Sequence, residues 1–214
     1  MKERREAARR AALEAGAFLR ERFAARFTGK IITKARNDFL TEVDRESEAM
    51  IKQLLASAFP SAAFLAEESA AAQKAEELWI IDPLDGTTNF IHGYPSIGVS
   101  IALMERGRVS VACVYDPLRE ELFEAELGGG AFLNGARIVV SGAEGLETSL
   151  LGTGFPYSVP ACLDGYLGAF RDLLRASRDI RRAGSAVLDL SHVAAGRLDG
   201  FWELHLRPWD VAAG

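Results

Sequence analysis

The sequence predicts a layered α+β fold in which helices and strands interleave. Residues 2–27 are rich in Ala, Arg, Glu and Leu with one apolar side, which is typical of a long amphipathic helix. The alternating runs 97–103 and 109–115 flank a short polar segment, which indicates a β-hairpin. With 214 residues and 49% hydrophobic content, the chain can bury a substantial core. We expect two tightly joined lobes, 1–145 and 146–214.

Further elements are expected along the rest of the chain. Thr41-Glu-Val-Asp44 has the form of a capping box and starts a helix that Phe59 and Pro60 close. Three glycines at 128–130 indicate a hairpin tip rather than a phosphate cradle, because no G-K-S/T follows. The other helices are expected at 162–176, at 185–195 and from 208, and the other strands at 30–34, 62–66, 79–81, 121–126, 136–141, 178–183 and 201–206.

Apolar spacing predicts which faces of two helices are buried. In the first helix the apolar side consists of Leu13, Ala17, Phe18 and Phe23, and Thr28 and Gly29 end the helix. In helix 162–176 the expected buried stripe consists of Leu163, Tyr166, Leu167, Phe170 and Leu174.

Composition argues against several classes of protein. A net charge of −5 argues weakly against nucleic-acid binding through a general basic surface, although it leaves a local patch open. Cys113 and Cys162 have no C-x-x-C spacing and are expected to be reduced thiols, consistent with a cytoplasmic chain. No apolar run approaches the ~20 residues of a membrane span, so we expect a soluble protein. The basic segment Met1–Arg10 has no apolar signal core behind it and is expected to be helical.

The segment Trp79–Phe90, W-I-I-D-P-L-D-G-T-T-N-F, carries the strongest chemical signal. Its apolar start predicts a buried strand, and Pro83 is expected to end that strand because proline lacks an N–H. Asp82 and Asp85 therefore share one strand end, followed by a glycine that allows close approach of a ligand and by two helix-capping threonines. Two carboxylates beside an anion-accepting turn suit Mg²⁺ bridging to a phosphate. A lone D-x-x-D-G can also be an ordinary turn.

Other acidic residues recur in positions that suit the same chemistry. Asp44 lies in the first turn of its helix, where capping and compensation of the helix dipole are the alternative explanation. Glu67 and Glu68 end the strand 62–66, where one of them can bridge to the Asp82 turn and both can also simply face solvent. Asp210 follows Pro208 near the last residue.

The string D-P-L-D-G-T-T-N-F resembles the metal-binding signature of the inositol monophosphatase family, the Mg²⁺-dependent, lithium-sensitive phosphomonoesterases. Three further pieces match in the right order: T-E-V-D at 41–44, E-E-S at 67–69 and P-W-D-V-A-A-G at 208–214. The resemblance covers nearly the whole chain. It implies a layered α/β/α/β/α sandwich, a homodimer and hydrolysis of phosphate monoesters without a covalent enzyme intermediate.

The resemblance also implies roles for individual residues. Glu67, Asp82 and the carbonyl of Leu84 would hold a first Mg²⁺, while Asp82, Asp85 and Asp210 would hold a second; a third, weaker ion near Glu67 is compatible with the family. Thr87, hydrogen-bonded toward Asp44, would orient the attacking water and help to deprotonate it, so the implied catalytic residues are Asp44, Glu67 and Thr87. The implied substrate-binding residues are Asp85, Gly86, Thr87, Gly184, Ser185, Ala186 and Glu203, with the amides of Gly86 and Thr87 on phosphate. None of His92, His192 and His205 matches a catalytic position.

The substrate implied first is a small polyol or sugar monophosphate such as inositol 1-phosphate. Fructose bisphosphate, histidinol phosphate and nucleotide 3′-phosphates compete, because all would use the same ligands. Glu203 and the loops near Arg181 and Arg182 are expected to discriminate among them. A different class of function is a non-catalytic partner in a protein or RNA complex. Arg178, Arg181 and Arg182 could form a basic patch for it, although ordinary surface charge or a dimer contact is the simpler explanation.

One departure from the family concerns the last residues. Family chains continue beyond W-D-V-A-A-G, whereas this one ends at Gly214. So few residues cannot hold an isolated helical turn. We therefore expect either a truncated C-terminal lobe or an Asp210 on a frayed end that binds the second Mg²⁺ weakly.

Overall fold

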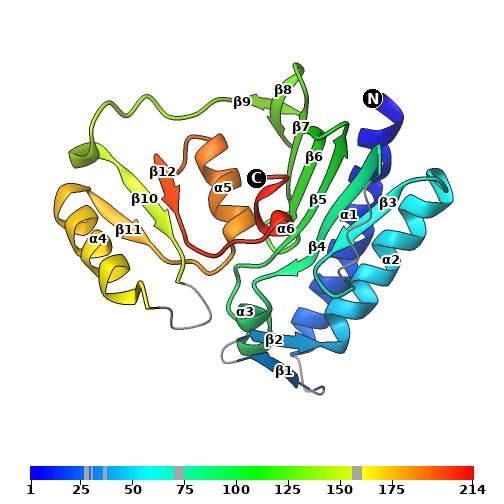
Figure 1. The fold of residues 1–214 in the computed structure, drawn as a ribbon, viewed down its shortest axis with the longest axis horizontal. Coiled ribbons are helices and arrows are strands. Elements are labelled where there is room, and N and C mark those ends of the chain that lie inside the picture. The colour runs from blue at the N-terminus through cyan, green and yellow to red at the C-terminus, as the bar shows by residue number, and fades with distance from the viewer. Residues whose placement is uncertain (27–28, 30, 36–37, 70–74, 156–160) are drawn as a thin grey trace.

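The computed structural model describes residues 1–26, 29, 31–35, 38–69, 75–155 and 161–214. Its elements form five layers, helix, sheet, helix, sheet and helix (Figure 1). The predicted α/β/α/β/α sandwich is therefore confirmed. The helices are α1 (Lys2–Ala24), α2 (Glu42–Ala58), α3 (Thr87–His92), α4 (Leu163–Ala176), α5 (Ala186–Ala194) and α6 (Pro208–Val211), with a short 3₁₀ turn at Leu146–Thr148.

Two sheets make up the β-layers. The larger has seven strands in the order β3-β4-β5-β6-β7-β8-β9, and only β3 and β4 pair in parallel within it. The smaller is parallel, in the order β11-β10-β12, and β1 with β2 forms a separate ribbon. The strands are β1 (Ile31–Ala35), β2 (Asp38–Thr41), β3 (Ala63–Ala66), β4 (Glu77–Asp85), β5 (Gly98–Glu105), β6 (Arg108–Asp116), β7 (Glu121–Glu126), β8 (Gly130–Leu133), β9 (Ala136–Ile138), β10 (Leu150–Thr153), β11 (Asp179–Arg181) and β12 (Gly200–Trp202).

The larger sheet is covered on both faces. On one face α1 and α2 bury a core that includes Trp79, Ile81 and Ile101. On the other face α5 inserts Val187 and Leu188 against strands β6 and β7. Because these contacts fix the apolar face of α5, the first turn of α5 is held near the end of β4. The segment Trp79–Phe90, which we call the signature segment, lies at this end.

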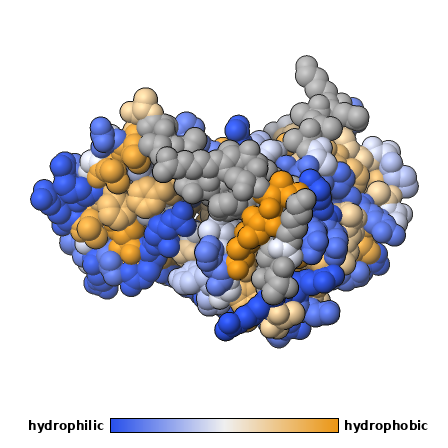
Figure 2. All heavy atoms as spheres, turned by 90° about the horizontal axis from the view of Figure 1, so that it is seen from below, coloured by the Kyte–Doolittle hydropathy of each residue, from blue (hydrophilic) through white to orange (hydrophobic). Residues whose placement is uncertain are grey.

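The two predictions about helix faces are partly wrong. The buried face of α1 consists of four alanines, Gly16 and Leu19, and Gly16 lies so close to the Tyr115 ring that a Cβ there would overlap it. The larger Leu13 and Phe18 are only half-buried, because small side chains let the helix approach the sheet closely. In α4, Leu167 and Leu174 are 44% and 47% exposed instead of buried. Figure 2 shows hydrophobic side chains on the left of its view, the side on which α4 lies in Figure 1.

Strand β4 differs from its prediction at the signature segment. It runs through Pro83 to Asp85 instead of ending before the proline. Asp82 pairs with Ser100 and Asp85 with Gly98, so β4 holds one residue more than β5 between these pairs. A β-bulge of this kind tolerates a residue that cannot donate to the ladder, which is why proline fits here.

Other strand boundaries were also predicted wrongly. Strands β2 and β8 were not predicted, and β9 stops at Ile138 because Val139 and Val140 continue without pairing and stay exposed. Strand 178–183 shortens to β11, and strand 201–206 shortens to β12, so that Glu203 follows the strand instead of lying on it. The expected end of the first helix at 27–28, and residue 30 of the first strand, lie outside the described residues. No helix in the described part of the chain is long and apolar enough to cross a membrane.

Candidate active site

The parallel pairing of β3 with β4 places two of the predicted acids side by side. Ala66 is opposite Ile81, and the Glu67 amide donates to the Ile81 carbonyl at 3.2 Å. Glu67 therefore leaves its strand beside Asp82, whose side chain is buried. Burial and then the charge of Glu67 are the two largest causes that raise the pKa of Asp82 well above its usual value.

The charges of Asp85 and Asp210 also act on the Asp82 carboxyl group. After burial and Glu67, the charges of Asp85 and Asp210 also raise the pKa of Asp82. Asp210 reaches this position because α6 packs against β4, β5 and α5, with Trp209 next to apolar residues of the sheet. The Ser100 hydroxyl donates to the Trp209 carbonyl at 3.2 Å. Asp210 thus lies on a packed turn, which differs from the frayed end that was one of our two expectations.

Asp85 has a second role that the sequence did not reveal. Its Oδ2 accepts hydrogen bonds from the Ser185 hydroxyl at 2.7 Å and from the Val187 amide at 2.9 Å. The carboxylate therefore caps the first turn of α5 from a strand about a hundred residues away in sequence. Burial raises the pKa of Asp85 to about 7, although these hydrogen bonds act in the opposite direction.

The donor set fits a hard divalent cation. It consists of carboxylates and the Leu84 carbonyl, all oxygen, which Mg²⁺ prefers over the sulfur and imidazole ligands of softer metals. Asp82, Asp85 and Asp210 each accept a hydrogen bond from a backbone amide, at 3.1, 2.9 and 2.6 Å. Among the described residues, no three acidic, histidine or cysteine side chains already meet at distances that would ligate a single ion. The carboxylates would therefore have to turn toward one.

Asp44 and Thr87 meet as predicted. The Thr87 hydroxyl lies 2.9 Å from Asp44 Oδ1 and 3.2 Å from the Leu84 carbonyl. Asp44 also accepts from the amide of Thr41 in the capping box that starts α2, so the capping interpretation and the contact with Thr87 both hold. Burial raises the pKa of Asp44, and the hydrogen bonds from Thr41 and Thr87 oppose that rise.

The turn after Asp85 can be made only by glycine. Gly86 has φ +93°, and a Cβ there would lie 2.8 Å from the Ser96 carbonyl oxygen and 3.3 Å from that of Gly184. The turn therefore brings α3 close to the Gly184 segment. Gly86 is the N-cap of α3 and has no side chain, so Thr87 and Thr88 lie inside the helix and do not occupy the capping position expected from the sequence.

Glu203 and Asp189 surround the same region. The Glu203 carboxylate covers Gly154, where an added Cβ would overlap it. Burial, followed by the charge of Asp85, raises the pKa of Glu203 to about 8, and Arg182 acts in the opposite direction. The sequence analysis missed Asp189, which lies buried in the first turn of α5 and whose pKa burial and Asp85 raise to about 7. Its only signal in the sequence was an acid within an apolar helical pattern.

Comparison with known proteins gives a consistent result. The family model described as "Inositol monophosphatase family" matches residues 1–214. The chain belongs to this family. A protein named "Nus factor SuhB" from Pseudomonas aeruginosa is 51% identical over 187 residues, which cover 85% of this chain and 69% of that protein.

Solved structures support the family fold. The extragenic suppressor protein suhB from Bartonella henselae superposes with a TM-score of 0.92 at 40% identity, over 97% of this chain and 81% of that one. A structure titled "IMPase/NADP phosphatase complexed with Mg2+ and phosphate" superposes with a TM-score of 0.77 at 31% identity, over 87% and 70% of the two chains.

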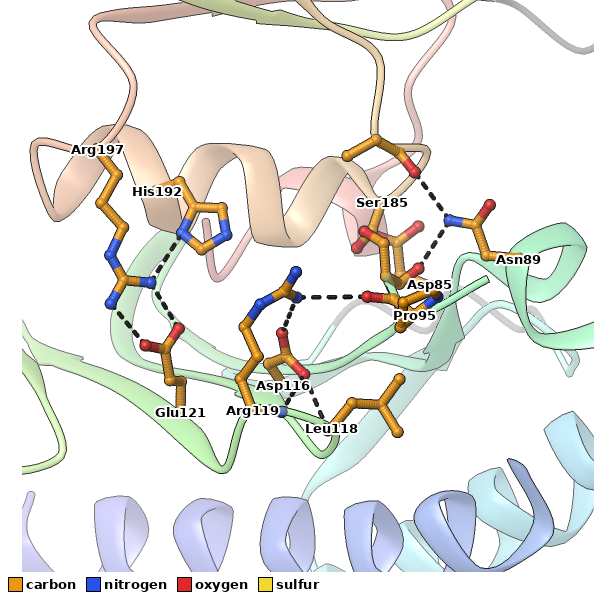
Figure 3. A network of polar contacts seen from close by, with 12 residues as sticks. Asp85, Asn89, Pro95, Asp116, Leu118, Arg119, Glu121, Ser185, His192 and Arg197 are labelled. Carbon is orange, nitrogen blue, oxygen red and sulfur yellow. Dashed lines mark hydrogen bonds and ion pairs between the residues drawn. The ribbon is translucent and has the colours of Figure 1, made fainter. Parts of the chain in front are cut away.

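Two arginines of this inositol monophosphatase family member, Arg119 and Arg197, form ion pairs and hydrogen bonds near the site. Figure 3 shows Arg197 reaching both Glu121 and His192, and Arg119 reaching Asp116, beside the group formed by Asp85, Asn89 and Ser185. Burial lowers the pKa of His192, as expected for a histidine that packs against the core.

The three arginines considered as a basic patch each act on a different acid. Arg181 pairs with Asp179. The charge of Arg182 acts on Glu203, and that of Arg178 on Asp199. The pair of Arg181 with Asp179 fits the simpler explanation of ordinary surface charge, whereas Arg182 acts on an acid of the candidate site.

Proposed function

We propose that this protein hydrolyses small polyol or sugar phosphate monoesters in a Mg²⁺-dependent reaction, with inositol 1-phosphate as the first candidate. The observation that carries the proposal is the convergence of Glu67, Asp82, Asp85 and Asp210, which come from three segments of the chain. Buried like charges are unfavourable unless protons or a cation compensate them, and a divalent cation can compensate several carboxylates at once. Membership of the inositol monophosphatase family supports the same conclusion.

The carboxylates divide between two ions in this proposal. Glu67, Asp82 and the Leu84 carbonyl would hold the first, and Asp82, Asp85 and Asp210 the second, with a third, weaker ion near Glu67. Bound there, Mg²⁺ would neutralise phosphoryl oxygens and lower the pKa of an attacking water.

Thr87 and Asp44 would handle the proton of that water. The Thr87 hydroxyl donates to Asp44 at 2.9 Å, so its oxygen can accept a hydrogen bond from a water on the other side. As the water attacks phosphorus, its proton passes to the Thr87 oxygen while the Thr87 proton passes to Asp44. The raised pKa of Asp44 favours this transfer. The bond from phosphorus to the ester oxygen breaks, the leaving oxygen takes a proton from solvent water, and Asp44 later returns its proton to solvent. The products are inorganic phosphate and the free alcohol.

The other residues would bind the substrate. The amides of Gly86 and Thr87 at the start of α3 would hold phosphate, together with Asp85 at the strand end. Gly184, Ser185 and Ala186 would face the hydroxyls of the polyol with Glu203. Without bound ions the pKa of Glu203 is raised to about 8, so in that state its carboxyl group can donate as well as accept a hydrogen bond near neutral pH.

A panel of phosphate esters with Mg²⁺ tests this function, with release of inorganic phosphate as the readout. We expect turnover of inositol 1-phosphate by the parent protein and a loss of at least about 100-fold in Asp82→Asn. Asp116→Asn is the matched control, because Asp116 is equally buried but lies outside the acidic cluster. The proposal is wrong if no ester on the panel, including fructose bisphosphate, histidinol phosphate and a nucleotide 3′-phosphate, is hydrolysed faster by the parent than by Asp82→Asn.

A second candidate function follows from the name of the 51% identical relative, a Nus factor. We propose it as a role in a protein or RNA complex that can coexist with catalysis. The test is complementation of a Pseudomonas aeruginosa strain that lacks its own Nus factor SuhB, using the parent and Asp82→Asn. Complementation by the parent and by Asp82→Asn would assign a role that does not need the metal-binding carboxylates. Failure of both proteins to complement would argue against a role in such a complex. The homodimer, the cytoplasmic location and lithium sensitivity stay predictions.

A further inference from the structure

We propose that Asn89 is a positioning residue that sets the polyol-binding turn at a fixed distance from the metal-binding strand. The inference rests on the proposed function of the Gly184–Ala186 turn. It deepens that function, because it assigns selectivity for the alcohol part of the substrate to a residue outside the expected ligand set.

Asn89 joins two segments that lie far apart in the sequence. Its side-chain amide nitrogen, on α3, lies 2.9 Å from the Ala183 carbonyl, 3.2 Å from the Gly184 carbonyl and 2.7 Å from the Ser96 carbonyl. An amide group has two hydrogens, so both are used and the nitrogen is fully engaged. Figure 3 shows Asn89 on the α3 side of this junction, next to Asp85 and Ser185.

The junction is tightly packed from both sides. Gly184 has φ +87°, and a Cβ there would lie 3.0 Å from the Asn89 side-chain nitrogen and 3.3 Å from its oxygen. A Cβ at Gly86 would lie 3.5 Å from the same nitrogen. The asparagine therefore fills the space between two glycine turns, and the Gly184 turn cannot shift without breaking its hydrogen bonds to Asn89.

Asn89 is neutral, whereas Asp85, the other residue that connects this part of the site to the start of α5, carries a carboxylate. Asp85 also joins β4 to α5, through Ser185 and Val187, but the same carboxylate is a proposed ligand of Mg²⁺. A carboxylate that turns toward an ion weakens its hold on α5, whereas an amide is indifferent to the ion. Asn89 can therefore keep the turn in place while Asp85 serves the metal.

Loss of Asn89 should affect the alcohol part of the substrate and leave the phosphate part intact. In Asn89→Ala the Ser96, Ala183 and Gly184 carbonyls lose their donor, and the Gly184–Ala186 turn gains freedom. We expect the KM for inositol 1-phosphate to rise about tenfold at nearly unchanged kcat. For 4-nitrophenyl phosphate, which has no polyol hydroxyls, kcat/KM should stay within about twofold.

The experiment uses the full chain with Mg²⁺ and two readouts. The first is steady-state kinetics on the two esters, and the second is hydrogen–deuterium exchange of residues 183–190, which requires no activity. Asn89→Ser is a milder variant in case Asn89→Ala fails to fold. Asn134→Ala is the matched control, since Asn134 also binds backbone through its amide, to Glu120 and Leu122, but in the β7–β8 hairpin region.

The expected result is about tenfold faster exchange at 183–190 in the Asn89 variants, no such change in Asn134→Ala, and the split between the two esters. Unchanged exchange in the Asn89 variants overturns the inference. An equal loss on both esters also overturns it, because Asn89 would then support the phosphate site or the general fold. If the parent hydrolyses neither ester, the proposed function fails, and exchange alone decides whether Asn89 positions the turn.

Discussion

Asp85 combines two tasks, and two substitutions should separate them. Asparagine keeps a side-chain oxygen that can accept from Ser185 and Val187, so Asp85→Asn retains the cap of α5 and removes the charge. Alanine removes both. We expect both variants to lose Mg²⁺-dependent turnover by at least about 100-fold, and we expect Asp85→Asn to be the more stable of the two without metal.

The size of the effect follows from the pKa of Asp85, which burial raises from 3.8 to about 7. The folded protein therefore binds this proton more tightly than the unfolded chain, and stability falls as the pH rises between these two values. The shift corresponds to about 4 kcal/mol at most, and relaxation of neighbours reduces it to about 2 to 4 kcal/mol. Without Mg²⁺ at pH 8, Asp85→Asn should thus raise Tm by about 5 to 10 °C.

Asp85→Ala removes the same charge but leaves two buried donors, the Ser185 hydroxyl and the Val187 amide, without an acceptor. Each unsatisfied donor costs about 1 to 3 kcal/mol, so this variant should be at least about 2 kcal/mol less stable than Asp85→Asn. The assay is calorimetry or urea unfolding with EDTA at pH 6 and pH 8, repeated with Mg²⁺. The parent should gain stability from pH 8 to pH 6 and from added Mg²⁺, and Asp85→Asn should gain less from both. If Asp85→Asn is no more stable than the parent at pH 8 without metal, the buried charge of Asp85 is not the cost that we infer.

Three further substitutions test other parts of the site. Thr87→Val removes the hydroxyl between water and Asp44, so kcat should fall about 100-fold with little change in Tm; kinetics showing an unchanged kcat would exclude the proposed proton path. Gly154→Ala places a Cβ against the Glu203 carboxylate, so the KM for inositol 1-phosphate should rise about tenfold while turnover of 4-nitrophenyl phosphate persists; an equal change for both esters would contradict a substrate-binding role of Glu203. Ser47→Ala removes the 2.9 Å hydrogen bond to the Pro83 carbonyl, and urea unfolding should show a loss of about 1 to 2 kcal/mol together with weaker Mg²⁺ binding in a titration. Full Mg²⁺ affinity would mean that the bulge holds its shape without Ser47.

The local parts of the site could be predicted from the sequence. Asp82, Leu84 and Asp85 lie within one short string, and Thr41 to Asp44 form a capping box, so their neighbourhood follows from adjacent residues. The position of Glu67 required one step more, because it depends on the parallel pairing of β3 with β4. The resemblance to the inositol monophosphatase family selected Glu67. The sequence pattern alone left open whether either glutamate bridges to the Asp82 turn or both face solvent.

The parts that were missed depend on contacts between distant segments. The cap that Asp85 provides for α5 joins residues about a hundred positions apart, and no periodicity reports such a contact. Pro83 was taken to end its strand because the bulge that accommodates it depends on β5. The buried face of α1 was misjudged because apolar size was taken as the guide, whereas close packing on the sheet selects alanine.

Burial alone does not separate a functional acid from a structural one in this protein. Asp116 is fully buried, yet it accepts from the amides of Leu118 and Arg119 at 2.9 and 3.0 Å and pairs with the Arg119 guanidinium at 2.7 Å. Its charge is therefore compensated by the chain itself. Asp82 instead has acids as its charged neighbours, which raise its pKa together with burial. Folding alone gains nothing from gathering like charges, so Asp82 needs either a proton or a cation beside it. Under the proposed function the cation takes that place, and unfolding experiments should show that added Mg²⁺ stabilises the parent protein more than Asp82→Asn.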